Sequence, residues 1–141
     1  TAKLNPPFEY VHDQVGFNYR MPNLNAALLC AQLEQLEFFV AQKRKQALKL
    51  GSFFDGVNIT FRKEQEDAKD NYWLMAIELN DRRERNWFLS TMNEAGVMCR
   101  PIWKLICDLP MYQNYYRDEQ INARYLEDRI VNVPSSVLLD E

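Results

Sequence analysis

The sequence predicts an α+β fold in which one long helix packs on a small, mainly antiparallel sheet and two shorter helices cover one face of that sheet. The long helix is expected because no helix breaker stands between Asn23 and Gly51. The sheet is expected because short runs rich in β-branched and aromatic residues alternate with helical patterns after Gly51. With 141 residues and 47% hydrophobic content, the chain is the size of a single domain that buries its own core.

Three segments follow one another along this predicted domain. Residues 1–22 are expected to form an irregular arm, since prolines and a glycine interrupt it and no period is sustained. The helix is expected over 23–50, with Asn23 as its N-cap and Gly51 in the left-handed position after its end. Its leucines recur at helical spacing and would face either a core or a dimer seam. The small sheet would lie within 51–141.

The segment 51–141 divides into short strands and helices. Strands are expected over 57–61, 72–79 and 97–103, and helices over 82–95 and around 121–126. Asp81 and Glu84 have the spacing of a capping box at the start of the first of these helices. The strand, helix and strand between residues 72 and 103 then form a split βαβ unit.

Composition argues against several classes of partner. The chain carries 17 basic and 20 acidic residues, a net charge of -3, so no overall field would attract nucleic acid or an anionic membrane. The longest apolar run, 26–31, is far shorter than the roughly 20 residues of a membrane-spanning helix. Three cysteines without a paired spacing and a single histidine, His12, predict neither a disulfide framework nor a metal site. A reducing cytoplasm is the expected setting.

A motif near the amino-terminal end carries the functional signal. Residues 15–36 read VGFNYRMPNLNAALLCAQLEQL and contain the spacing GxNxRM before a helix rich in alanine and leucine. Further segments of the same pattern are NYWL at 71–74, RPIW at 100–103, LPMY at 109–112 and RIVNVPSS at 129–136. With these motifs the chain resembles, over nearly its whole length, the DegT/DnrJ/EryC1/StrS family of sugar aminotransferases. Within that family it is most similar to the branch that aminates 4-keto sugars for legionaminic-acid-type nonulosonic acids.

The resemblance implies the small C-terminal domain of a fold-type I enzyme that depends on pyridoxal 5'-phosphate and works as a homodimer. The implied reaction moves an amino group from glutamate to a nucleotide-linked 4-keto-6-deoxy sugar, for cell-surface polysaccharide or nonulosonic acid synthesis. The family's catalytic lysine lies in a large domain upstream of GxNxRM. We therefore expect no catalytic residue in this chain, and no transamination by the chain alone.

Two residues of the motif are the predicted cofactor contacts. Asn18 matches the family asparagine that reaches across the dimer to the phosphate of the neighbouring subunit's cofactor, and its amide can donate the hydrogen bond this role needs. Arg20 could add charge to the same anion site. On residue type alone, Asn18 would simply tolerate a tight turn after Gly16, and Arg20 would be a surface charge.

Four residues are the predicted substrate contacts: His12, Tyr19, Arg100 and Trp103. A guanidinium and an indole suit a diphosphate and the face of a sugar or uracil, and both fall where the family forms its sugar-nucleotide pocket. Three of the four have a plainer reading: His12 as a loop histidine bound to backbone, Tyr19 as an aromatic that anchors the arm, and Trp103 as a core aromatic on a strand. Cys107 stands where many relatives have a histidine and is expected to be a small packed residue.

Other classes of function remain open at this stage. The chain could be a free-standing binding or dimerisation module without catalysis. A cluster of arginines at 82–85 beside Trp87 could bind nucleic acid, although acidic residues flank it and weaken this reading.

Overall fold

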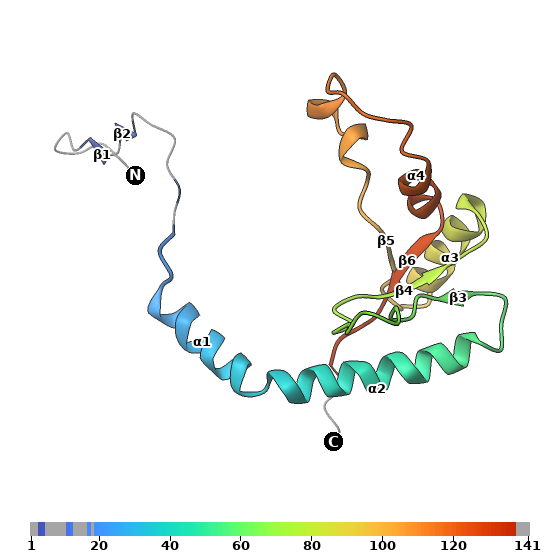
Figure 1. Ribbon diagram of the computed structural model, residues 1–141, viewed down its shortest axis with the longest axis horizontal. Coiled ribbons are helices and arrows are strands. Elements are labelled where there is room, and N and C mark those ends of the chain that lie inside the picture. Colours follow the sequence, from blue (N-terminus) through green and yellow to red (C-terminus); the bar gives the residue numbers. More distant parts are fainter. Residues whose placement is uncertain (1–2, 5–10, 13–16, 18, 138–141) are drawn as a thin grey trace. The chain divides into compact units, whose positions relative to one another are not determined.

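The structure is a computed structural model that describes residues 3–4, 11–12, 17 and 19–137, with the backbone alone at 3–4 and 11–12. The chain groups into two compact units, 1–36 and 37–141, and each is described by itself. That the whole chain is one small domain stays a prediction. Figure 1 shows the elements of both units in chain order.

The first unit contains a short strand pair and one helix. Strands β1 (Lys3–Leu4) and β2 (Val11–His12) pair antiparallel, with Lys3 opposite His12. Helix α1 (Asn23–Glu34) follows. Its N-cap is Pro22 rather than the predicted Asn23, because Pro22 has extended backbone angles (φ -60°, ψ 145°) and its carbonyl accepts the first helical hydrogen bond.

The single helix predicted over 23–50 is two helices in the structure. Gln35 leaves the helical conformation (φ -108°, ψ 5°), and its N–H binds the carbonyls of Gln32 and Leu33 in place of the regular helical partner. Helix α2 (Leu36–Phe54) begins directly after it. No glycine or proline lies at this position, so the residue types do not predict the interruption.

The leucines of α1 are exposed in this chain. No residue of α1 is buried, and Leu24 and Leu28 are 79% and 62% exposed. Their predicted place in a core is therefore wrong for the chain as it stands, and a dimer seam remains a prediction.

Helix α2 packs on the sheet through its second half. Its buried residues are Ala47, Gly51 and Phe54, spaced by four and three so that they share one face. Gly51 was predicted to end the helix in the left-handed position, and this is wrong, because the helix continues to Phe54. A Cβ at Gly51 would lie 3.5 Å from the side chains of Phe61 and Lys63, which is ordinary packing distance.

The second unit is built on a four-stranded sheet. Its strands are β3 (Thr60–Phe61), β4 (Met75–Glu78), β5 (Arg100–Pro101) and β6 (Ile130–Val133). Their order is β3-β4-β6-β5, and each neighbouring pair is antiparallel, so the predicted mainly antiparallel sheet is confirmed. Since β4 and β5 both pair with β6, they run parallel to each other and form the predicted split βαβ unit with α3 (Arg82–Glu94). The strands are shorter than predicted.

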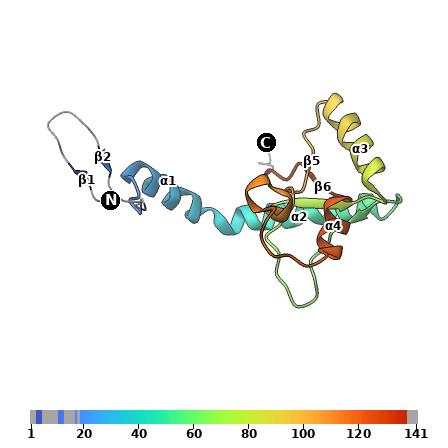
Figure 2. The ribbon, with the colours of Figure 1, turned by 90° about the horizontal axis from the view of Figure 1, so that it is seen from above.

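The two faces of the sheet are covered by different helices. Met75 and Ile77 of β4 are fully buried and belong to the core cluster, against which Phe88 and Leu89 of α3 also pack. Glu78 points to the opposite face because strand side chains alternate, and its carboxylate accepts a hydrogen bond from Tyr125 of α4 (Ile121–Glu127). The expectation that both shorter helices cover one face is therefore wrong. Figure 2 shows α3 and α4 on either side of β4.

Helix α3 has the ends that the sequence predicts. The Asp81 carboxylate accepts the N–H of Glu84 at 2.8 Å, which satisfies a backbone donor of the first turn. The Glu84 carboxylate binds the N–H of Asn80 rather than that of Asp81, so the capping box is displaced by one residue.

Two short 3-10 turns, Ile106–Asp108 and Pro110–Tyr112, lie between β5 and α4.

Candidate functional site

The arm that carries the GxNxRM motif is described only in part. Asn18 lies outside the described residues, and at His12 only the backbone is described. The rings of Phe17 and Tyr19 contact each other, with centroids 5.9 Å apart, and these residues are 73% and 88% exposed. Arg20 is exposed as well. The described part of the arm thus presents aromatic rings and a guanidinium, groups that suit a phosphorylated aromatic compound.

Trp103 forms an exposed stacked pair with Trp73. The ring centroids are 6.4 Å apart and the ring planes are inclined by 28°, within the range of offset stacking. Trp73 is 67% exposed and Trp103 is 70% exposed. The reading of Trp103 as a core aromatic is therefore wrong. We call these two side chains the tryptophan ledge.

Hydrogen bonds from three chain segments fix the backbone at Trp73. Its carbonyl accepts the Lys43 ammonium at 3.3 Å and the Ser135 hydroxyl at 3.0 Å, and its N–H binds the Asn71 side-chain oxygen at 2.9 Å. Lys43 also donates to the Ser135 carbonyl. Burial lowers the pKa of Lys43. The backbone is thus held by α2, by the turn before β4 and by the segment after β6, while the indole stays exposed.

Tyr72, directly before Trp73, has a left-handed backbone with φ 49°. For a residue with a side chain this conformation costs about 1 kcal/mol, so the surroundings must favour it. Its N–H binds the Asp70 carboxylate at 2.7 Å, and its hydroxyl accepts the Glu64 N–H at 3.2 Å. Tyr72 is buried in the core, whereas Trp73 is turned outward.

Arg100, another predicted substrate residue, lies on edge strand β5 opposite Asn132. Its side chain is exposed, and one of its nitrogens is 3.7 Å from the Met98 sulfur. Within the part of the chain that the structure describes, Arg100 takes part in no ion pair. Its charge is therefore not neutralised by a carboxylate there, and it is three positions from Trp103 in the same segment.

A hollow of about 710 Å³ lies in the segment that follows the ledge. This volume falls in the usual range for small-molecule sites. Its lining is mainly aromatic and basic: Lys104, Leu105, Ile106, Cys107, Tyr112, Tyr115, Tyr116, Arg117 and Gln120. Sequence reasoning missed this hollow, although three tyrosines within five residues were a visible signal. Arg117 shapes its wall by donating to the carbonyls of Cys107 and Gln113.

Cys107 is half-buried at the edge of this hollow. Its sulfur is 3.9 Å from the carboxylate of Asp108, a weak contact of the kind that a packed cysteine makes. Asp108 is itself bound to Arg124 at 3.0 Å, and that hydrogen bond lowers the pKa of Asp108. This arrangement agrees with the packed residue that the sequence suggests.

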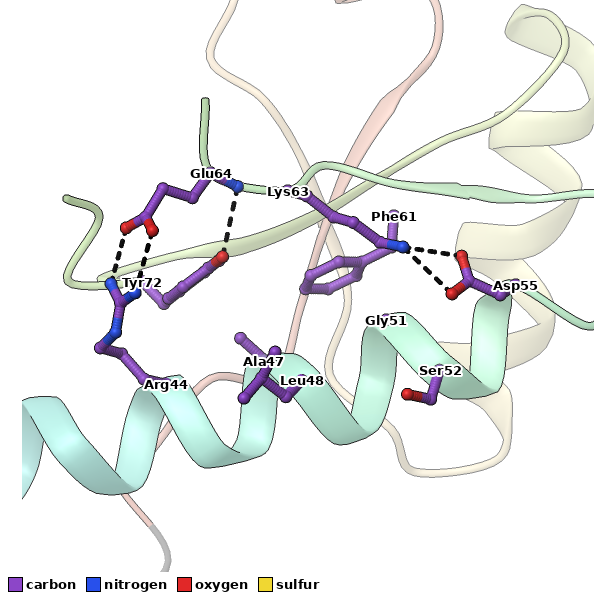
Figure 3. Close-up of a pocket in the computed structure, with 10 residues that line it drawn as sticks. All are labelled: Arg44, Ala47, Leu48, Gly51, Ser52, Asp55, Phe61, Lys63, Glu64 and Tyr72. Atoms are coloured by element: carbon purple, nitrogen blue, oxygen red, sulfur yellow. Dashed lines mark hydrogen bonds and ion pairs between the residues drawn. The ribbon is translucent and has the colours of Figure 1, made fainter. Parts of the chain in front are cut away.

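A smaller pocket of about 290 Å³ lies between α2 and the segment after β3 (Figure 3). Hydrogen bonds from the Arg44 guanidinium and from the Asp70 N–H lower the pKa of Glu64 to about 2. Lys63 pairs with Asp55 at 2.8 Å. Both cations at this pocket thus bind carboxylates of the chain, so their charge is neutralised and the pocket is poorly suited to an anion.

The described residues include neither a metal-binding cluster nor a membrane-spanning helix. Residues 17 and 19–137 hold no group of three or more histidine, cysteine, aspartate or glutamate side chains that could hold a metal ion. No helix in the described part is long and apolar enough to cross a membrane.

Cys99 is buried in the core, and this burial raises the pKa of its thiol.

The second unit thus has an α+β fold with an exposed tryptophan ledge, and the described part of the arm carries exposed aromatic rings. The chain matches the DegT/DnrJ/EryC1/StrS aminotransferase family over residues 5–141. It belongs to this family, which confirms the resemblance seen in its motifs.

One curated relative, GDP-perosamine synthase of Escherichia coli O157:H7, is 33% identical over 129 residues, which cover 90% of this chain and 34% of the relative. The chain therefore spans about a third of the length of the curated relatives it matches.

Solved structures share the fold. Helicobacter pylori PseC, an aminotransferase involved in pseudoaminic acid biosynthesis, has a TM-score of 0.76 at 18% identity, covering 96% of this chain and 38% of PseC. Escherichia coli GDP-4-keto-6-deoxy-D-mannose-3-dehydratase, solved with bound hydrated pyridoxal phosphate, has a TM-score of 0.71 at 23% identity, covering 93% of this chain and 35% of the dehydratase. The expected small domain of a pyridoxal-phosphate sugar aminotransferase fold is confirmed.

Proposed function

We propose that this chain is the carboxy-terminal part of an aminotransferase that moves an amino group from glutamate to a nucleotide-linked 4-keto-6-deoxy sugar. The family match over residues 5–141, in a chain about a third as long as its relatives, carries this proposal. Relatives from two bacteria are named for a GDP-linked amino sugar, which supports a nucleotide sugar as acceptor. The legionaminic-acid-type branch and a cytoplasmic location are finer predictions within it.

The cofactor of the family is pyridoxal phosphate, and the described residues fit one side of a site for it. Arg20 offers a guanidinium suited to a phosphate, and Phe17 and Tyr19 offer exposed rings suited to a pyridine. The predicted phosphate contact of Asn18 would add an amide donor. When bound, the cofactor supplies the electron sink that amino transfer requires. This chain would orient the cofactor of the neighbouring subunit, and the lysine would come from the large domain of that subunit.

The substrate side of the proposal rests on Arg100 and Trp103. An exposed guanidinium without a carboxylate partner among the described residues suits a diphosphate, because it can donate two parallel hydrogen bonds. The indole of Trp103, three positions further along the chain, offers a flat apolar face. His12 and Tyr19 remain predicted contacts from the arm.

Cofactor retention in the intact protein that contains this chain tests the proposal. Asn18→Ala and Arg20→Gln should each lower the fraction of pyridoxal phosphate that stays bound through gel filtration, because a phosphate contact is lost. Arg83→Gln, an exposed arginine on α3, is the matched control and should retain the cofactor fully. Unchanged retention in both arm variants would contradict the phosphate role.

The exposed leucines of α1 favour a second, non-catalytic role as a dimerisation module. Sedimentation of the 141-residue chain would test it, and Leu28→Glu should convert any dimer to monomer. In this reading the intact protein would neither retain pyridoxal phosphate nor transaminate. If the intact protein retains pyridoxal phosphate and transaminates, dimerisation through α1 would be one property of the enzyme and not a separate function.

A further inference from the structure

We propose that Trp73 joins Trp103 to form a stacking platform for the nucleobase of the nucleotide-linked substrate. This inference rests on the proposed function and adds a residue, Trp73, that the family motifs alone do not single out as a contact. It concerns the second unit only, since both tryptophans belong to residues 37–141.

The exposure of the ledge is the first support. Two neighbouring indoles that are 67% and 70% exposed leave a large flat apolar surface in contact with water, which is unfavourable unless something covers it. The two rings are stacked, with centroids 6.4 Å apart and planes inclined by 28°, and the exposed fractions show that much of each side chain stays open to a ligand. A flat ring is the natural occupant of such a surface, since every nucleobase has a π-face that stacks on tryptophan.

The fixed backbone at Trp73 is the second support. Lys43, Ser135 and Asn71 bind its carbonyl and N–H, and the left-handed Tyr72 turns it away from the core. An exposed side chain on such a constrained backbone has already lost part of its freedom, so a ligand that stacks on it incurs a smaller entropic cost. A surface tryptophan without a binding role would not require these hydrogen bonds to its backbone.

The position of Arg100 favours a nucleotide over a plain sugar. A nucleotide sugar joins a flat base to a diphosphate, and this segment offers a stacking surface and a guanidinium three residues apart. A saccharide ring could also lie on an indole, but its hydroxyls would need polar partners. The other occupant to consider is the remainder of the intact protein, which would cover the ledge by packing.

Binding of nucleotides to the 141-residue chain tests the platform without any need for pyridoxal phosphate. GDP and UDP would be titrated by calorimetry, with mannose 1-phosphate and pyrophosphate as probes that lack a base. We expect both nucleotides to bind, and both base-free probes to bind at least 10-fold more weakly. Tryptophan fluorescence should be quenched by the two nucleotides alone.

Variants identify the surface. Trp73→Ala and Trp103→Ala should each weaken GDP binding about 10-fold, from the usual strength of base stacking on an aromatic side chain. Trp73→Phe, which keeps a ring, should lose less and guards against a folding defect, which circular dichroism would reveal. Trp87→Phe is the matched control, because Trp87 is 64% exposed on α3 and outside the ledge.

Three results would overturn the platform: no nucleotide binding by the wild-type chain, equal binding by Trp73→Ala, or equal binding of mannose 1-phosphate. The first would favour packing against the rest of the protein, and the third a sugar site. Failure of the proposed function would give a different result. The intact protein would then not retain pyridoxal phosphate, while the tryptophan ledge would still bind nucleotides.

Discussion

Arg44 and Glu64 form a two-point ion pair, with Nη1 2.6 Å from Oε2 and Nη2 2.9 Å from Oε1 (Figure 3). Glu64 also accepts the N–H of Asp70, and Arg44 donates to the Asp70 carbonyl. The pair therefore ties α2 to Glu64 and Asp70 of the segment between β3 and β4. Because Tyr72 and Trp73 follow Asp70 in that segment, the ion pair helps to define where the tryptophan ledge begins.

The stability contributed by this pair should depend on pH. The pKa of Glu64 is lowered from 4.5 to about 2 in the folded chain, so the unfolded state binds more protons between these values. The contribution is complete above about pH 4.5 and is lost as the pH falls through about 2. Glu64→Gln should therefore be less stable than wild type in urea unfolding at neutral pH, and the two should converge in acid.

A glutamate in the same segment provides the control for that series. Glu66 is exposed, and Glu66→Gln should follow the wild-type stability at every pH. A constant difference between Glu64→Gln and wild type across the acid range would show that the carboxylate charge is not what stabilises the segment.

Gly96 should resist substitution for a reason of backbone conformation alone. It has φ +80°, and a Cβ there would meet nothing within 4 Å, so no steric clash contributes. Gly96→Ala should destabilise the chain by about 1–2 kcal/mol, the cost of a left-handed residue with a side chain. Gly56→Ala is the matched control, since its Cβ would make an ordinary 3.6 Å contact and its φ is not positive. Thermal unfolding that ranks the two alike would contradict this explanation.

Ile77 tests where the core lies. Its side chain is fully buried between the sheet and the helices of the core face, so Ile77→Ala should cost about 2–5 kcal/mol through lost burial and a cavity. Ile77→Val, which removes one methylene, should cost about 1 kcal/mol and keeps the test readable if the alanine variant unfolds. Ile121→Ala, at a position 68% exposed, should change stability by less than about 0.5 kcal/mol in the same denaturant titration.

Local signals in the sequence were sufficient where the structure depends on near neighbours. The start of α3 is such a case, because the Asp81 cap acts within three residues. The interruption at Gln35 is the opposite case, since the helix pattern continues through it and no breaker residue stands there. The strand predicted over 72–79 was too long at its start, because Tyr72 takes a left-handed conformation and β4 begins only at Met75. That conformation is held by Asp70, two residues earlier, and by the backbone of Glu64, eight residues earlier, so strand propensity alone did not reveal it.

The candidate site was predictable only in part for the same physical reason. Trp103 could be singled out from its motif, but its stacking partner Trp73 is 30 positions away and comes close only through the fold. The hollow beyond the ledge likewise needs the turns at 106–112 to bring its tyrosines together. The cofactor role of Asn18 stays a prediction, because that residue lies outside the described part of the chain.

Arg100 should contribute charge to substrate binding without contributing to stability. Its side chain is exposed and pairs with no carboxylate among the described residues, so Arg100→Gln should leave the urea midpoint unchanged. In the intact protein, the same change should raise KM for the nucleotide sugar about 10-fold, because a charge-assisted hydrogen bond to a phosphate is lost. The KM of the Arg100→Gln variant should also depend less on salt concentration than the wild-type KM. Arg83→Gln, with the same change of charge on α3, should keep the wild-type KM and salt response. Equal KM values for the two variants would show that Arg100 does not contact the diphosphate.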